Sequence, residues 1–146
     1  MELNTAIHIL SLHQKWRKGG DEMQNPEKIT RAIDKILNFF ECKKSVNEDV
    51  LNLIESEIFI NFGYNFQQLR HHSRKEEIIK ARQISMYLIK TNTTLSLAQI
   101  GSIFDKKHDT VLYTVRAVKD VMSIDKVFNN IISKIQTRLN DKIQNI

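Results

Sequence analysis

The sequence is poor in residues that interrupt or cross-link a chain: its 146 residues include one cysteine, one proline and four glycines. A single cysteine cannot form an intrachain disulfide or hold a metal cluster, and we expect Cys42 to be a buried thiol. With 41% hydrophobic residues, the scarcity of proline and glycine indicates a compact all-α protein. The length fits one domain, or one domain with an appendage, and allows a sizeable core.

Long apolar runs are also missing. No stretch approaches the roughly 20 consecutive apolar residues that a membrane-spanning helix needs. The segment 1–16 does not have the layout of a signal peptide, because its cations follow the apolar part. We therefore expect a cytoplasmic protein that makes no membrane contact.

The patterns of catalytic sites are absent from the sequence. There is no GxxxxGK[ST] word for nucleotide phosphates, no paired acid and base, no nucleophile elbow and no metal-ligand spacing. His71 and His72 are adjacent, so they point to different sides of most backbones and do not converge on a metal. We expect a protein that is not an enzyme, has no ATPase activity, and needs no cofactor or metal.

The net charge of +5 is unevenly distributed. Residues 1–68 contain 8 Lys or Arg and 10 Asp or Glu, residues 69–123 contain 10 and 5, and residues 124–146 contain 4 and 2. The positive charge is concentrated in residues 69–123, as expected for a segment that binds nucleic acid.

Residues 74–121 have the pattern of a helix-turn-helix. Ser96 and Gln99 form a capping box that predicts the start of a short helix. Inside that helix, Gly101 costs roughly 1 kcal/mol relative to alanine, and we expect a close helix crossing there. The apolar pattern breaks only over residues 105–109, which is the length of the corner between two helices. The apolar residues of the helical pattern are Ala81, Ile84, Tyr87, Leu88, Leu97, Ile100, Ile103, Phe104, Val111, Leu112, Val115 and Val118.

The second helix of this motif is expected to carry the DNA-reading residues. In a helix-turn-helix, the N-terminal residues of the second helix meet base edges in the major groove. Here these residues are His108, Asp109 and Thr110, and Lys106 and Lys107 lie at the corner where phosphates pass. The residues predicted to point outward from this helix are Thr110, Tyr113, Thr114, Arg116 and Ala117.

Three words in the sequence carry a more specific signal: ARQISMYL, TTLSLAQIGSIF and HDTVLYTVRAV, in this order and at this spacing. Together they resemble the C-terminal DNA-binding domain of DnaA, the bacterial replication initiator, whose helix-turn-helix is of Trp-repressor type. The resemblance implies that Arg74 enters the minor groove and that Arg82 and Gln83 bind phosphates. It also implies that His108 and Thr110 face bases in the major groove.

The sequence departs from the family pattern at the start of the second helix. Where the family has Asp-His-Thr-Thr, this chain has Lys107, His108, Asp109 and Thr110, and its corner is one residue shorter. Asp109 can accept a hydrogen bond from cytosine N4, but it repels phosphate. Alternatively, Asp109 is the N-cap of a helix that begins one residue later. The base preference of the family therefore cannot be assumed for this chain.

The chain before residue 45 predicts an N-terminal helical hairpin over residues 1–44. Residues 4–16 and the segment from Asn25 to about Cys42 have amphipathic helical patterns joined by a loop, KGGDEMQN, with Asn25 as N-cap before Pro26. No chemistry is evident in this hairpin, which lies outside the resemblance. We expect it to serve a protein partner or self-association.

The remaining residues, 45–146, are predicted to form the DnaA-like domain. Ser45 and Glu48 form a capping box that predicts a new helix, ending near Gly63. The resemblance covers about residues 48–142 of the chain.

These patterns predict a sequence-specific protein that binds double-stranded DNA, has no ATPase, and is cytoplasmic and nucleoid-associated. Its expected role is replication control or transcription regulation of a phage or mobile element. The alternative is a protein-interaction adaptor that keeps the fold and has lost DNA binding, suggested by Asp109, Glu76 and Glu77. The residues predicted to bind DNA are Arg70, Arg74, Lys75, Arg82, Gln83, Lys106, Lys107, His108, Asp109, Thr110 and Arg116.

Overall fold

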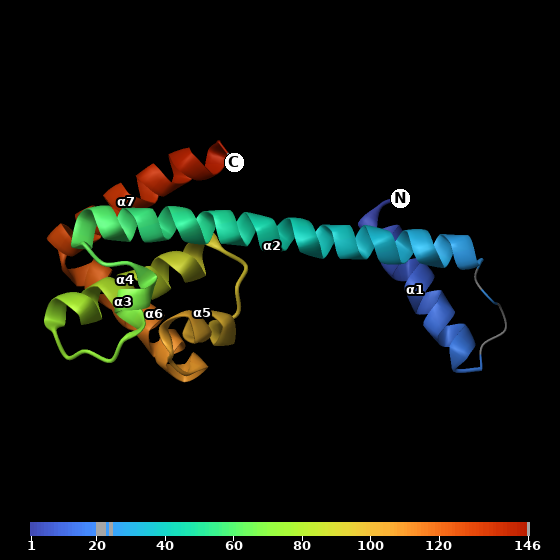
Figure 1. Cartoon of the computed structure of the whole chain (residues 1–146), viewed down its shortest axis with the longest axis horizontal. Helices are drawn as coiled ribbons and strands as arrows, with labels where there is room; N and C mark the ends of the chain where they lie inside the picture. Colours follow the sequence, from blue (N-terminus) through green and yellow to red (C-terminus); the bar gives the residue numbers. More distant parts are fainter. Residues whose placement is uncertain (20–22, 24, 146) are drawn as a thin grey trace. The chain divides into compact units, whose positions relative to one another are not determined.

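The computed structural model describes all residues except 20–22, 24 and 146 (Figure 1). The described residues form helices and no strand, which confirms the all-α class. The helices are α1 (Leu3–Arg17), α2 (Pro26–Phe62), α3 (Phe66–Arg70), α4 (Glu76–Asn92), α5 (Leu97–Phe104), α6 (His108–Ile124) and α7 (Lys126–Gln144). None of these helices combines the length and the apolar character needed to cross a membrane. By their internal contacts the residues divide into two compact units, Met1–Ser45 and Val46–Ile146.

In the first unit, α1 packs against the beginning of α2 through a small apolar cluster. The cluster consists of buried Ala6, Ile9 and Ala32 and partly buried Leu10, Ile29 and Ile36. Cys42 is exposed, so the expected buried thiol is wrong. Its position lies outside the face of α2 that carries Ala32. Residues 20–22 and 24 of the predicted loop lie outside the described residues.

Helix α2 is longer than the sequence patterns predict. It begins as expected, because Asn25 Oδ1 accepts a hydrogen bond from the backbone N–H of Glu27 (2.8 Å). The predicted end near Cys42 and the predicted start at Ser45 are wrong, since the helix continues from Pro26 to Phe62. No proline or glycine occurs between residues 27 and 62, so nothing forces a break.

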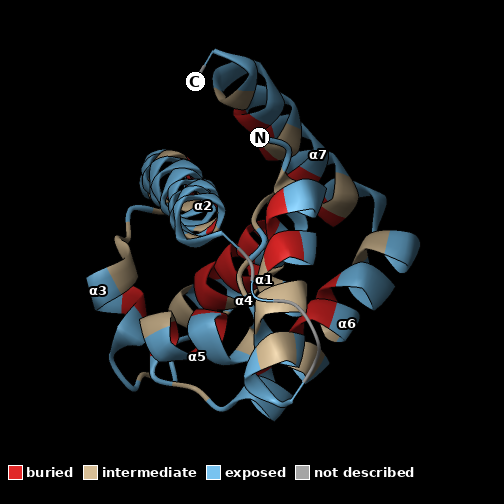
Figure 2. Cartoon of the chain, turned by 90° about the vertical axis from the view of Figure 1, so that its right-hand side faces the viewer, coloured by how far each residue is buried: buried red, intermediate tan, exposed pale blue. Residues whose placement is uncertain are grey.

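The second unit is built around α4. Figure 2 shows buried residues concentrated on this helix, which packs against α3, α5 and α6. The largest fully buried side chains of the unit are Ile54, Ile58, Leu69, Ile84, Met86, Leu88, Ile89, Ile100, Phe104, Ile132, Ile135 and Leu139. This core supports the surfaces that α4, α5 and α6 present to solvent.

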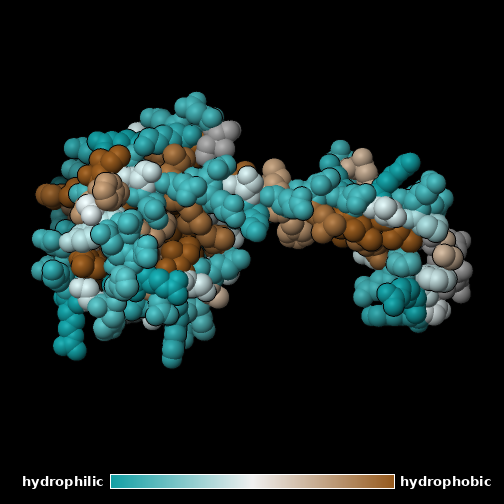
Figure 3. Space-filling view, in the orientation of Figure 1, coloured by the Kyte–Doolittle hydropathy of each residue, from teal (hydrophilic) through white to brown (hydrophobic). Residues whose placement is uncertain are grey.

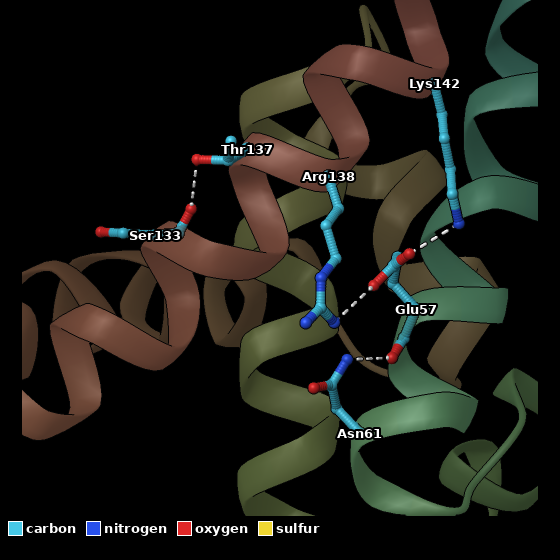
Figure 4. Close-up of polar contacts among 6 residues, drawn as sticks. All are labelled: Glu57, Asn61, Ser133, Thr137, Arg138 and Lys142. Carbon is cyan, nitrogen blue, oxygen red and sulfur yellow. Dashed lines mark hydrogen bonds and ion pairs between the residues drawn. The ribbon is translucent and has the colours of Figure 1, made fainter.

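A buried carboxylate joins α7 to the part of α2 within the second unit (Figure 4). The Glu57 side chain is only 2% exposed, and its Oε1 lies 2.7 Å from Lys142 Nζ. Its Oε2 lies 3.8 Å from Nη1 of Arg138. An unpaired carboxylate at this position would be costly, so both cations stabilise the packing of α7 against α2.

Candidate nucleic-acid interface

Helix α5, which leads into the corner before α6, begins with the predicted cap. Ser96 Oγ accepts a hydrogen bond from the backbone N–H of Gln99 (3.2 Å), and Gln99 Oε1 accepts one from that of Ser96 (2.9 Å), which confirms the capping box. After α5, Asp105 adopts the left-handed conformation (φ 53°, ψ 50°). The backbone N–H of Lys106 then donates to Gly101 O (2.8 Å) and closes the turn.

Gly101 is buried where the turn folds back onto α5. A Cβ atom at this position would overlap with the carbonyl oxygen of Lys106 and would lie 3.3 Å from its carbonyl carbon. The close approach is thus made by the backbone of the turn, and the expected helix crossing at Gly101 is wrong. Only glycine leaves room for the turn to stay this close.

Helix α6 begins at His108, directly after Lys107, the extended N-cap residue (φ −72°, ψ 153°). Asp109 is inside the first turn, so the alternative in which it caps a later helix start is wrong. A carboxylate there is favourable because the first turn has unpaired N–H groups. Asp109 Oδ1 lies 2.9 Å from His108 Nε2, and both side chains are exposed. The two groups therefore face solvent as a pair at the N-terminal end of α6.

The faces of α6 differ from the prediction at Thr114, which was expected to point outward. Thr114 is only 6% exposed, because it follows Val111 by three positions on the buried side of the helix. Thr110, Tyr113 and Arg116 are exposed as predicted, with Tyr113 at 75%. The outward side of α6 therefore carries a hydroxyl, a phenol and a guanidinium.

A short loop connects α3 to α4 and carries two predicted cations. A capping box starts α3, in which Asn65 Oδ1 accepts from the N–H of Gln68 (2.8 Å) and Gln68 Oε1 accepts from that of Asn65 (2.9 Å). The helix ends at Arg70, and α4 begins at Glu76. Both Arg74 and Lys75, at the end of the intervening loop 71–75, are exposed.

The loop 71–75, α4, the turn and α6 surround a cleft of about 440 Å³. The cleft brings together five residues that the sequence predicts to bind DNA: Arg74, Arg82, Gln83, Lys106 and Thr110. The other lining residues are His72, Ser73, Ile79, Met86, Tyr113 and Thr114. Residues from His72 to Thr114, which are 42 positions apart in the sequence, thus form one concave, cationic surface.

The other predicted residues lie outside the cleft lining. Lys107, His108 and Asp109 are exposed at the start of α6. Lys75 is the N-cap residue of α4. Arg70 is exposed, and its Nη1 donates to the carbonyl oxygen of Ser102 in α5 (3.3 Å).

Arg116 lies farther along α6. It is exposed and follows His108 by eight residues, which is about 12 Å along the helix axis. Contact with the same stretch of DNA by both residues therefore requires the groove to follow α6 for two turns.

Arg82 lines the cleft on its buried side. Its side chain is largely buried, and its Nε donates to Leu69 O (2.7 Å) while Nη2 donates to His71 O (2.9 Å). Desolvation lowers the pKa of the Arg82 guanidinium from its ordinary value. Arginine nevertheless remains protonated at neutral pH, so Arg82 contributes positive charge to the cleft. These two hydrogen bonds are not foreseeable from the sequence words.

Tyr113 is a further candidate that sequence reasoning did not include among the DNA-binding residues. It is exposed, it lines the cleft, and it follows Thr110 by three positions. The available signal was its outward position on α6, because an aromatic side chain that is not needed in the core is free to contact a ligand.

The corner, the exposed start of α6 and the adjoining cationic cleft define a helix-turn-helix domain. Residues 51–118 match a protein family described as the bacterial DnaA protein helix-turn-helix. This part of the chain is therefore a helix-turn-helix domain of the bacterial DnaA type.

Individual DnaA proteins are similar over more of the chain. The chromosomal replication initiator protein DnaA of Bacteroides fragilis is 34% identical over 75% of this chain and 22% of its own length. That of Flavobacterium psychrophilum is 32% identical over 94% of this chain and 27% of its own length. That of Borrelia hermsii is 30% identical over 97% and 30%. The chain thus spans less than a third of the length of these relatives.

The last two alignments correct the expected extent of the resemblance. They cover 94% and 97% of the chain, so the similarity reaches into the hairpin that was expected to lie outside it. Residues 1–44 contain only amphipathic patterns, which many helical proteins share, and these patterns do not distinguish one family from another.

Proposed function

We propose that this chain binds double-stranded DNA through the cleft and the N-terminal end of α6, without acting as an ATPase. The observation that carries the proposal is the cleft itself, which places Arg74, Gln83 and Lys106 beside Thr110 at the start of α6. A helix-turn-helix uses the same arrangement, with cations on phosphates and the second helix in the major groove.

Most of the affinity in this proposal comes from cations that meet phosphates or a groove. Residues 69–123 have 10 Lys or Arg against 5 Asp or Glu, so they attract DNA over several ångströms. The contributing side chains are Arg70, Arg74, Lys75, Lys106 and Lys107, with Gln83 as an uncharged phosphate ligand, and buried Arg82 adds positive charge to the cleft.

Sequence choice is assigned to the exposed start of α6. In this proposal His108 and Thr110 meet base edges, and Asp109 accepts a hydrogen bond from cytosine N4. Arg116 and Tyr113 extend this surface along the helix. Because Asp109 stands where the family has threonine, the preferred site has to be measured and is not taken over from typical family members.

The proposed biological role is control of replication or of transcription. The relatives are named chromosomal replication initiators, and this sequence has no GxxxxGK[ST] word. In this proposal these residues recognise a duplex site and do not themselves bind or hydrolyse a nucleotide.

Fluorescence anisotropy on two labelled duplexes tests the proposed function. One duplex carries a DnaA box, the site bound by the DnaA family, and the other has the same bases in scrambled order. Tighter binding to the box, weakening steeply with salt, is the expected result for a reader with family-like specificity. Equal and salt-sensitive binding would leave DNA binding intact and require selection of the site from random duplexes.

A protein-interaction adaptor is the second candidate. The observations that favour it are the exposed carboxylates of Glu76, Glu77 and Asp109, which border the cationic surface and repel phosphates. Absence of binding to either duplex at low salt would contradict the DNA-binding proposal and favour the adaptor.

We further propose that residues 1–44 mediate self-association. Ile33, Leu37 and Phe40 follow one another at four- and three-residue steps on α2 and are 43%, 53% and 62% exposed. Figure 3 shows apolar side chains gathered along this part of α2. Two copies can cover the same face in an isologous contact. Sedimentation of the protein and of Leu37→Glu tests this, and a monomeric parent protein would point to a different protein partner.

A further inference from the structure

The loop 71–75 has a defined path between two helices that are anchored in the core. α3 ends at Arg70, and Leu69 just before it is fully buried. The backbone N–H of Lys75 donates to Ser73 Oγ (3.2 Å) at the other end of the loop. Arg74 lies between these points, so its position depends on how the beginning of the loop is held.

The beginning of the loop is held by Arg82 of α4. The last carbonyl groups of a helix have no partner within the helix, and α3 has only five residues. Two carbonyl oxygens of this segment, those of Leu69 and His71, instead accept hydrogen bonds from Arg82 Nε (2.7 Å) and Nη2 (2.9 Å). The guanidinium therefore caps the C-terminal end of α3 from a different helix.

The burial of Arg82 sets it apart from the other cations. Among the residues that the structure describes, it is the only lysine or arginine in the buried class. A side chain that served mainly to hold phosphate would extend into solvent, as Arg74 and Lys107 do. Two of the three guanidinium nitrogens of Arg82 are instead bonded to the backbone of the loop segment.

We propose that Arg82 is a positioning residue for DNA recognition: it fixes the start of loop 71–75 and thereby places Arg74 for insertion into a groove. This inference rests on the proposed function, because it assigns a part in DNA binding. His71, whose carbonyl Arg82 holds, precedes Arg74 by three residues. Because His71 and Arg74 are so close in the chain, the position of the His71 carbonyl group limits where Arg74 can lie.

The planar fork of arginine suits this task better than other side chains. It presents several N–H donors in fixed directions, so it can bond two carbonyl oxygens at once, whereas the ammonium of lysine is a compact point charge. Removal of the guanidinium leaves two carbonyl groups without these partners. Because unpaired buried carbonyls are unfavourable, the loop is expected to rearrange towards water.

A measurement without DNA tests the structural half of the inference. The single native thiol is replaced by Cys42→Ser, and a nitroxide is attached at His72→Cys, an exposed loop position. In Arg82→Met, which keeps a long side chain, the electron spin resonance lines are expected to narrow as the loop becomes mobile. Arg82→Lys is expected to give intermediate lines. Identical spectra for all three proteins would overturn the inference.

Circular dichroism during thermal unfolding accompanies this measurement. If Arg82→Met does not fold, Arg82→Lys retains the positive charge and a single donor nitrogen, and its spectrum decides the question. Narrower lines from a folded Arg82→Lys support the inference, and lines like those of the parent protein contradict it.

A double-mutant cycle on DNA tests the functional half. The duplex is the one that the parent protein binds best, and the variants are Arg74→Ala, Arg82→Met and their combination. Each single change is expected to weaken binding by about tenfold, and the combination by about the same factor, because both act through Arg74. Lys90→Ala, an exposed cation of α4 outside the cleft lining, is the matched control and should bind like the parent protein.

The double-mutant cycle would give a different result if Arg82 itself were a ligand of a DNA phosphate. If Arg82 bound phosphate independently, the two losses would multiply to about a hundredfold, and each change would reduce the salt slope by about 0.9. That outcome would overturn the positioning role. If the parent protein binds no duplex, the proposed function fails, whereas the resonance measurement still decides whether Arg82 holds the loop.

Discussion

Replacement of Gly101 by alanine separates the packing of the turn from the helix propensity of α5. Alanine in a helix interior is favoured over glycine by about 1 kcal/mol, so propensity alone predicts stabilisation. In the structure, however, the new Cβ overlaps with the Lys106 carbonyl oxygen. Because this atom belongs to the backbone, no side-chain rotation removes the overlap.

The expected net effect is destabilisation. Overpacking that shifts backbone typically costs about 1–3 kcal/mol, so after the gain of about 1 kcal/mol in propensity Gly101→Ala is expected to be less stable by up to about 2 kcal/mol. The turn also carries Lys106 and Lys107, which are proposed to meet phosphates, so its displacement should weaken DNA binding by about tenfold or more.

Urea denaturation and DNA-binding anisotropy are the two assays for this variant. The matched control is Ala98→Gly, at an exposed position of the same helix, which should lose about 1 kcal/mol of stability without altering the turn. A Gly101→Ala protein that is more stable than the parent and binds DNA equally well would refute the packing argument.

The remaining predictions concern the interface and the core. Lys107→Ala should weaken binding to every duplex alike and reduce the salt slope by about 1, as measured by anisotropy at several salt concentrations. His108→Ala should cost about 1–3 kcal/mol on the preferred duplex only, and equal loss on all duplexes would remove it from base readout. Glu57→Gln should lower stability by about 1–3 kcal/mol in urea, since it weakens the pairing with Lys142 at 2.7 Å. Lys134→Ala, an exposed change on the same α7, should leave stability within about 0.5 kcal/mol.

The helix-turn-helix is largely predictable because its signals are local. The capping box at Ser96 and the apolar steps through Val111, Val115 and Val118 depend on residues a few positions apart. The five-residue break in the pattern also indicates the corner. Such signals survive in any tertiary context that keeps one helix face buried.

Errors occur where a local signal has more than one structural meaning. Ser45 and Glu48 have the spacing of a capping box, yet the same residues are accepted inside a continuous helix when neither proline nor glycine is near. Thr114 was predicted to point outward because threonine is polar, but its small side chain fits the buried side of α6. Gly101 signals a close approach without revealing which part of the chain approaches.

The geometry of the candidate site could not be predicted from single positions. The words of the sequence identify Arg82 as a family residue, but its bonds to Leu69 and His71 depend on the packing of α3 against α4. The cleft similarly depends on the path of the turn at Lys106, which is set by backbone contact with Gly101.

A nuclear magnetic resonance titration of the isotopically labelled chain with a duplex it binds tests the proposed DNA-binding surface most directly. We expect the backbone amide signals of loop 71–75, residues 106–110 and the first half of α4 to shift, while those of α1 and α7 change little. Shifts confined to the hairpin, or spread evenly over the chain, would contradict the assignment of the cleft and the start of α6 as the DNA-binding surface.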